Sequence, residues 1–105
     1  MKPSVRTPLP GPKAWALLER GERVLSPSYV RPYPFVPARG QGAFLEDVDG
    51  NLFLDFMSGI AVNTTGYAHP KVVEAVRAQA ERFAHVCFSD FTHERQDEIS
   101  RQMIN

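Results

Sequence analysis

The side chains best suited to bind a metal ion lie in the second half of the chain. They are three histidines and the single cysteine, His69, His85, Cys87 and His93. Imidazole nitrogen and thiolate sulfur are ligands that zinc prefers, but structural zinc sites hold their ligands at short, regular spacings. The spacing here matches none of those patterns. The sequence therefore predicts no metal site.

A second group of reactive side chains, Asp47, Asp49 and Asp55, surrounds a predicted β-hairpin. Two carboxylates held close together can act as a general acid and base. Turn formation accounts for Asp49, however, and an exposed strand face accounts for the other two. Gly40 and Gly42 lack the third glycine of a dinucleotide-binding loop, and no serine occupies a Gly-x-Ser-x-Gly frame. The residues alone predict no self-contained catalytic site.

Composition narrows the class of protein. The chain has 105 residues, 12 basic and 12 acidic side chains, and 43% hydrophobic residues, which is typical of a soluble globular protein of one domain at most. The zero net charge gives no electrostatic basis for binding nucleic acid or an anionic membrane. One cysteine permits no intrachain disulfide, which fits a reducing compartment. No stretch resembles a membrane span or a signal peptide, so we expect a cytoplasmic protein.

Prolines divide the chain, because eight of the nine lie at or before Pro37. Proline removes a backbone donor and restricts φ, so residues 1–39 are predicted to form an extended arm. A short helix over Lys13–Arg20 follows Pro12 and ends before Gly21. The aromatic residues of such an arm need a second surface to cover them.

Residues 40–105 show the patterns of a small α+β unit. A hairpin is predicted over about residues 43–56, with Asp49-Gly50 forming a type I′ turn. An irregular loop over residues 60–68 leads to an amphipathic helix over about 70–84. A last helix is predicted from about residue 92 to the chain end, with Thr92 as a candidate cap.

Three segments in a fixed order carry a family resemblance: Arg39–Asn51 (RGQGAFLEDVDGN), Leu54–Val62 (LDFMSGIAV) and Gly66–Val76 (GYAHPKVVEAV). Through them, the sequence from about Ser28 onward resembles the N-terminal region of the class III aminotransferases. These are pyridoxal-phosphate enzymes of fold type I and include the 4-aminobutyrate and acetylornithine aminotransferases. The segment His85–Glu94 is most similar to the 4-aminobutyrate branch or to related amino-acid racemases.

The resemblance implies an α/β protein of fold type I. This chain would supply only the N-terminal part of the small domain, with the arm over residues 1–39 and the remainder over residues 40–105. In the family, the arm and hairpin lie near a dimer interface. We therefore expect a homodimer in which a partner subunit covers the arm's aromatic residues.

The resemblance also implies two substrate-binding residues. By position, Ile60 would form an apolar wall of the substrate pocket, with a plain core residue as the alternative. Ser89 stands where the 4-aminobutyrate enzymes place a glutamine near the substrate, with a helix cap as the alternative. Tyr67 departs from the family pattern, which usually has His, and a structural packing role is expected for it.

The implied activity is transfer of an amino group from an amino acid, 4-aminobutyrate-like or another ω-amino donor, to a 2-oxo acid through pyridoxal 5'-phosphate. The family's Schiff-base lysine, its pyridine-nitrogen aspartate and its phosphate-binding turn lie further along the chain, so no catalytic or cofactor-binding residue is expected here. Lys71 belongs to the helix-start motif. We expect this segment alone to be inactive. Two alternatives stay open: a non-catalytic folding or dimerisation module, and a fragment of a related amino-acid racemase.

Overall fold

A computed structural model describes residues 1–104 of the chain, which fall into two units. The first unit, residues 1–70, holds α1 (Pro12–Val24), β1 (Pro37–Gln41), β2 (Phe44–Asp47), β3 (Leu52–Leu54) and α2 (Ser58–Ala61). The second unit, from Lys71 onward, holds α3 (Pro70–Ala80), which begins one residue earlier, and α4 (Glu94–Ile104). None of the helices within residues 1–104 has the length and hydrophobicity needed to cross a bilayer.

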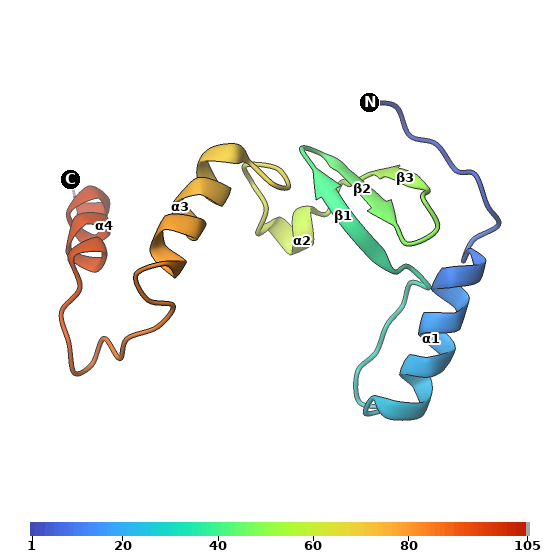
Figure 1. Ribbon diagram of the computed structural model, residues 1–105, viewed down its shortest axis with the longest axis horizontal. Coiled ribbons are helices and arrows are strands. Elements are labelled where there is room, and N and C mark those ends of the chain that lie inside the picture. The colour runs from blue at the N-terminus through green and yellow to red at the C-terminus, as the bar shows by residue number, and fades with distance from the viewer. Residues whose placement is uncertain (105) are drawn as a thin grey trace. The chain divides into compact units, whose positions relative to one another are not determined.

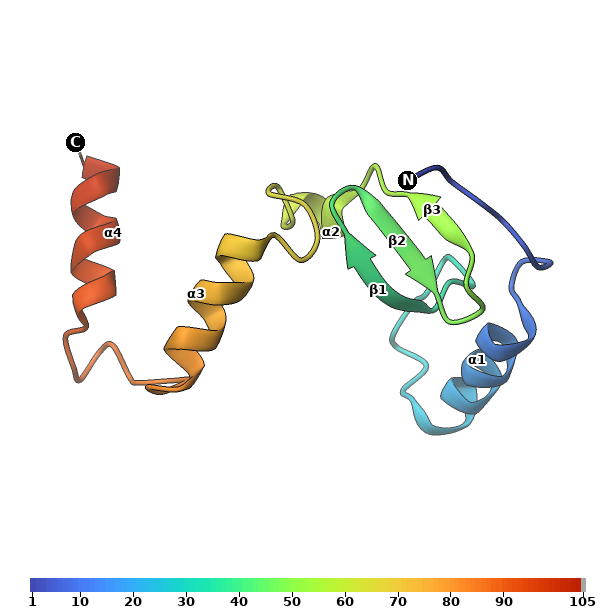
Figure 2. The same cartoon turned by 45° about the horizontal axis from the view of Figure 1, so that its top comes forward.

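A small antiparallel sheet with strand order β1-β2-β3 organises the first unit (Figure 1). In the β2–β3 hairpin, Leu45 pairs with Phe53, and in the β1–β2 pair, Gly40 pairs with Leu45. The N-terminal segment runs beside β3 (Figure 2), where Ser4 and Leu52 exchange two backbone hydrogen bonds of 2.8 Å. The arm therefore extends the sheet at its β3 edge.

A buried polar cluster closes the β2–β3 hairpin. Asn51 is 0% exposed and Asp47 is 4% exposed. Asp47 Oδ1 accepts hydrogen bonds from the backbone N–H groups of Asp49 (2.9 Å) and Asn51 (2.8 Å), and its Oδ2 accepts one from Asn51 Nδ2 (2.7 Å). The expectation that Asp47 lies on an exposed strand face is wrong, because its carboxylate binds the inside of its own turn.

Asn51 also ties the N-terminal arm to the hairpin. Its Oδ1 accepts hydrogen bonds from the backbone N–H groups of Arg6 (2.6 Å) and Thr7 (3.1 Å), and its Nδ2 donates to Thr7 Oγ1 (2.8 Å). A buried side-chain amide is tolerated when its donors and acceptor are paired in this way. Polar contacts hold the arm over residues 4–7, and further along the arm the Phe35 ring packs against Phe53 of β3 with centroids 5.2 Å apart.

The turn differs from the predicted type I′ geometry. Gly50 has positive φ (+83°) and donates to the Asp47 carbonyl (3.1 Å), but Asp49 is not in the positive-φ region. A type I′ turn needs positive φ at both of its central residues. The observed turn instead spans Asp47–Gly50 and has the left-handed glycine as its last residue, a geometry common in three-residue hairpin loops.

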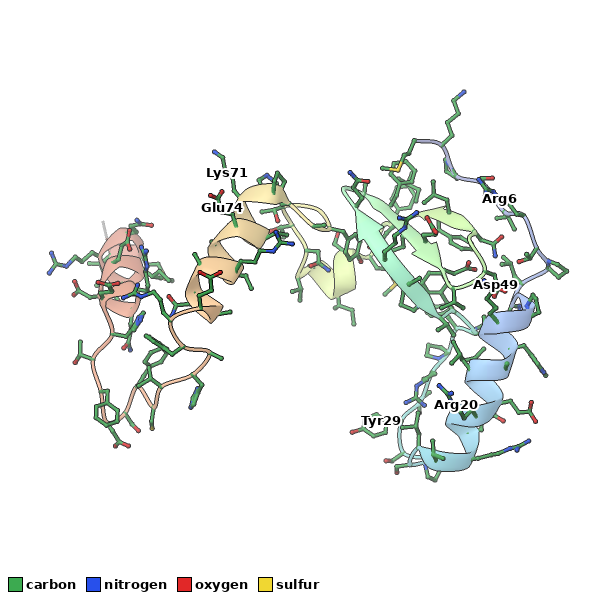
Figure 3. The ribbon with its side chains drawn as sticks, in the orientation of Figure 1. Arg6, Arg20, Tyr29, Asp49, Lys71 and Glu74 are labelled. Atoms are coloured by element: carbon green, nitrogen blue, oxygen red, sulfur yellow. The ribbon has the colours of Figure 1, made fainter. Side chains whose placement is uncertain are left out.

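In this turn the Asp49 carboxylate caps the N-terminus of α1, a helix that is distant from it in the sequence. Its Oδ1 and Oδ2 accept hydrogen bonds from the backbone N–H groups of Lys13 and Ala14, each at 2.9 Å. The first N–H groups of a helix lack partners within the helix and favour negative charge. Figure 3 shows Asp49 at the beginning of α1. Gly11 precedes the helix because a Cβ there would collide with the Asp49 carboxylate.

In the first unit, α1 is longer than the sequence predicts, and a strand forms where the sequence predicts an extended arm. The helix predicted over Lys13–Arg20 continues through Gly21 to Val24. Residues 37–41, expected at the end of the arm, form β1, and this strand crosses the boundary predicted between residues 39 and 40. The division into those two domains stays a prediction about the whole protein.

In the second unit, His93 lies between the ends of the two helices. Its ring packs edge-on against Phe83 (centroids 5.0 Å apart), and its Nδ1 accepts the backbone N–H of Arg95 (3.1 Å) in the first turn of α4. Arg82 and Glu94 form an ion pair at 3.0 Å. The sequence predicts a helix to residue 84, whereas α3 ends at Ala80 and a turn follows.

Asn51→Ala in the protein that contains this chain is expected to lower the free energy of unfolding by about 3 kcal/mol, since it leaves the buried Asp47 carboxylate and the arm's N–H groups without their partner. Chemical denaturation followed by circular dichroism measures this loss. Gln41→Ala, which removes an exposed amide from β1, is the matched control and should change stability by no more than about 0.5 kcal/mol. Equal effects of the two substitutions would contradict this role of Asn51.

Candidate functional site

The most unusual backbone of the chain is the turn α2. All four of its residues, Ser58, Gly59, Ile60 and Ala61, have positive φ, between 50° and 62°. Ala61 N–H donates to the Met57 carbonyl and Val62 N–H to the Ser58 carbonyl, each at 2.9 Å. Hydrogen bonds of helical spacing with positive φ make this a single turn of left-handed helix.

This turn stores strain at Ile60. A left-handed helix brings Cβ close to the following carbonyl oxygen and costs roughly 1–2 kcal/mol per residue that is not glycine. A β-branched residue with φ of +62° is a clear outlier. Such residues persist only where the surrounding structure holds them, and they cluster at ligand-binding and catalytic sites. Ile60 is also 81% exposed, so its side chain projects from the described surface.

Asp55 holds the beginning of the left-handed turn. Its Oδ1 accepts the Met57 N–H (2.7 Å) and its Oδ2 accepts the Ser58 N–H (3.0 Å). The spacing of a carboxylate two and three residues before these N–H groups is that of an Asx-type turn. The expectation of an exposed strand face does not include this role of Asp55, although an aspartate at a strand end before Phe-Met-Ser-Gly is a signal for it.

Tyr67 joins this turn to the sheet. Its hydroxyl donates to Asp55 Oδ2 at 2.6 Å. Its backbone exchanges two hydrogen bonds with Gly42, of 2.8 and 2.9 Å, and its ring lies so close to Gly40 that a Cβ there would be 2.5 Å from the Tyr67 Cγ. The packing role expected for Tyr67 is therefore confirmed, and a hydrogen bond accompanies it.

The hydroxyl–carboxylate contact shifts both groups. The hydrogen bond from the Tyr67 hydroxyl, together with those from the Met57 and Ser58 N–H groups, lowers the pKa of Asp55 below its ordinary value of 3.8. The same contact and partial desolvation raise the pKa of Tyr67 above 10.0, while a hydrogen bond from Asn63 works in the opposite direction. Across the neutral range Asp55 is therefore an anion and Tyr67 a neutral donor, which is the pairing the geometry requires.

The two residues expected to bind substrate lie in different units. Ile60 lies in the first unit, on the left-handed turn. Ser89 lies in the second unit, where its Oγ is 3.0 Å from Cys87 Sγ in the segment before α4. The first turn of α4 receives its side-chain cap from His93, not from Ser89 or Thr92. Their part in substrate binding stays a prediction.

The histidines and the cysteine do not converge. Within residues 1–104, no three metal-binding side chains lie close enough to share an ion. The lysines likewise offer no place for pyridoxal phosphate, since a lysine that forms an imine is activated by burial or by neighbouring cationic groups. Lys2, Lys13 and Lys71 are all exposed, and Figure 3 shows Lys71 projecting from the first turn of α3. We assign the cofactor no residue of the described chain.

Comparison with known proteins points to one family. The family described as aminotransferase class-III matches residues 25–105. An alanine/serine racemase from Pyrococcus horikoshii is 45% identical over 97% of this chain and 22% of its own length. A 4-aminobutyrate aminotransferase from Mycobacterium tuberculosis is 40% identical over 92% of this chain and 22% of its own length. The chain thus spans about a fifth of the length of these curated relatives.

Solved structures agree on the fold. The acetylornithine aminotransferase from Elizabethkingia anophelis superposes with a TM-score of 0.76 and 31% identity, over 86% of this chain and 23% of that one. The fold expected from the sequence, the N-terminal part of a fold type I enzyme with local α+β character, is confirmed.

Tyr67→Phe is expected to change how stability depends on pH. The lowered pKa of Asp55 stabilises the folded state above about pH 4, and this stabilisation is lost as the pH falls through the folded-state pKa. The raised pKa of Tyr67 stabilises the folded state below about pH 10, and this stabilisation is lost as the pH rises through the folded-state pKa. The variant loses the Tyr67 contribution and the part of the Asp55 contribution that comes from the hydroxyl, while the Met57 and Ser58 N–H bonds to Asp55 remain. Wild type should therefore be more stable than the variant at neutral pH, and the difference should shrink in acid and in alkali.

Urea unfolding at acid, neutral and alkaline pH measures this difference. Ser100→Ala removes an exposed hydroxyl from α4 and is the control, with no expected change in how stability depends on pH. A wild-type advantage that stays constant over the whole range would contradict the role of the Asp55 contact.

Proposed function

The chain belongs to the class III aminotransferase family, and from this premise we propose that the protein containing it transfers an amino group from an amino donor to a 2-oxo acid. The family consists of enzymes that use pyridoxal phosphate, which acts as an electron sink for the carbanion formed at the reacting carbon. The observation that carries the proposal is the family match over residues 25–105. The 4-aminobutyrate and acetylornithine relatives make a terminal amine on a carboxylic acid the favoured donor class.

Within that function, Ile60 forms an apolar wall of the donor pocket. Its exposure on a strained turn supports this role, since a core residue would be buried and a plain surface residue would have no need of the strain. An apolar wall suits the methylene chain that separates the amine and the carboxylate of an ω-amino acid.

Ser89 makes the second contact in this proposal and distinguishes the chain from the 4-aminobutyrate enzymes. A serine hydroxyl reaches less far than a glutamine amide, so it leaves space for a donor of different length or branching. His93, not Ser89, caps the N-terminus of α4. The Ser89 side chain is exposed in the segment before that helix.

Racemisation of an amino acid is the second candidate. The Pyrococcus horikoshii alanine/serine racemase covers more of this chain, at higher identity, than the Mycobacterium tuberculosis aminotransferase does. With pyridoxal phosphate bound, both reactions would begin with loss of a proton from the carbon that bears the amine, and they would differ in where a proton is returned.

We further propose a homodimer located in the cytoplasm. A groove between α1 and residues 29–37 supports the dimer, because large aromatic side chains line it while staying exposed: Trp15 is 62%, Tyr29 68% and Tyr33 66% exposed. Apolar surface of this kind marks a site covered by another protein surface. A second subunit would bury it.

The full-length protein is expected to convert a 2-oxo acid to its amino acid in proportion to the donor consumed. Incubation with 4-aminobutyrate or ornithine and 2-oxoglutarate, followed by chromatography of the products, measures this transfer. A chiral separation after incubation with L-alanine or L-serine alone is the parallel assay. If the D-isomer forms in the absence of a 2-oxo acid and no amino group is transferred in the first assay, the function is racemisation rather than amino transfer.

Ile60→Gly is expected to raise the KM for the amino donor about tenfold through loss of the apolar wall, while stabilising the fold by about 1 kcal/mol through relief of the left-handed strain. Val62→Gly is the matched control: Val62 is 76% exposed but has ordinary helical φ of −84°, so glycine should destabilise there by about 1 kcal/mol and leave KM unchanged. Donor kinetics and thermal unfolding measure both effects. A destabilised Ile60→Gly protein with normal KM would contradict the proposed role.

A further inference from the structure

We propose that Asp55 and Tyr67 are positioning residues of the donor site: they hold the left-handed turn Ser58–Ala61 and so set where the Ile60 side chain meets the substrate. This inference rests on the proposed function, in which Ile60 lines the donor pocket. It adds two residues that act through the turn rather than by touching the substrate.

The turn needs an external constraint because it is unfavourable by itself. Three of its four residues have side chains that the left-handed region penalises, and Ile60 carries the largest penalty as a β-branched residue. Internal hydrogen bonds over so short a segment do not offset such a cost, since nucleating a single helical turn is unfavourable even in the right-handed form. The conformation therefore depends on contacts from outside the turn.

Asp55 supplies the first of these contacts. Its two oxygens bind the N–H groups of Met57 and Ser58, so the carboxylate fixes the direction in which the chain enters the turn. Bonds to a charged acceptor are stronger than neutral ones. A carboxylate that rotated about its own side chain would release both N–H groups together.

Tyr67 prevents that rotation. Its hydroxyl holds Asp55 Oδ2 at 2.6 Å, and its own position is fixed by the double backbone pairing with Gly42 and by ring contact with Gly40. The chain of contacts thus runs from the sheet through Tyr67 to Asp55 and into the turn. At the far end, Asn63 N–H donates to the Ser58 carbonyl at 2.9 Å, which closes the turn.

A double-mutant cycle on the full-length enzyme tests the inference. Wild type, Tyr67→Phe, Ile60→Gly and the double variant are compared by donor KM and kcat at neutral pH. Tyr67→Phe should raise the donor KM about tenfold, less than the hundredfold that a misplacement of about 1 Å can cost, and should alter kcat little. In the Ile60→Gly background the same substitution should change KM by less than about twofold, because the side chain it positions is gone.

Ser100→Ala, which removes an exposed hydroxyl from α4, is the control for hydroxyl removal and should match wild type in donor KM. If Tyr67→Phe does not yield folded protein, Asp55→Asn serves in its place: it keeps one acceptor oxygen for the turn, and a smaller KM rise is expected that again vanishes with Ile60→Gly. A donor KM equal to wild type in a folded Tyr67→Phe enzyme would overturn the inference. So would KM effects that multiply in the double variant, which indicate a general structural defect.

Hydrogen exchange gives a readout independent of activity. The amides of Ala61 and Val62, which bond within the turn, should exchange faster in Tyr67→Phe, while those of Lys13 and Ala14 should not change. Unaltered exchange at Ala61 and Val62 overturns the inference whatever the activity. Absence of both transfer and racemisation in the wild-type enzyme is the failure of the proposed function, and it is visible before any variant is made.

Discussion

The first unit depends on one small set of buried hydrogen bonds, those of the turn between Asp47 and Asn51. The most deeply buried side chain of the described residues is the amide of Asn51, not an apolar group. Buried polar groups in a low-dielectric setting are costly when unpaired and specify a unique arrangement when every member is paired. Here each bond fixes a different segment: Asp47 shapes the turn, Asn51 holds residues 6 and 7, and Asp49 caps α1. One hairpin end thereby determines the course of the arm and the position of the first helix.

A second constraint operates at the opposite end of the same hairpin, where Asp55 follows β3. The sheet there supports a left-handed turn that its own sequence disfavours, and Tyr67 transmits that support through a hydroxyl and two backbone bonds. Strain of this kind is retained where it presents a side chain in a direction that ordinary backbone would not allow. Both ends of the hairpin thus use an aspartate whose oxygens bind backbone N–H groups, at one end to build the fold and at the other to present Ile60.

The large apolar side chains differ from the polar cluster because many of them are not buried within the unit. Trp15, Tyr33 and Phe56 lie largely exposed in their unit, and the chain spans about a fifth of its curated relatives. Burial of large apolar side chains is the dominant stabilising contribution in folded proteins. The polar turn therefore arranges these side chains, and surfaces beyond this unit would supply the burial.

Sequence by itself determined the family and most of the local elements, but not β1 or the left-handed turn α2. The hairpin, the helices after Pro12 and Pro70, and the order of the three family segments depend on patterns a few residues long, which the chain displays directly. Only the tertiary structure decided how Asp47, Asp49 and Asp55 are used. Asp49 caps a helix 35 residues away and Asn51 binds N–H groups 45 residues away, and no local pattern encodes a partner at that separation. Likewise, nothing in Ser-Gly-Ile-Ala predicts positive φ at all four residues, because contacts from Asp55 and Tyr67 override the backbone preference of each one.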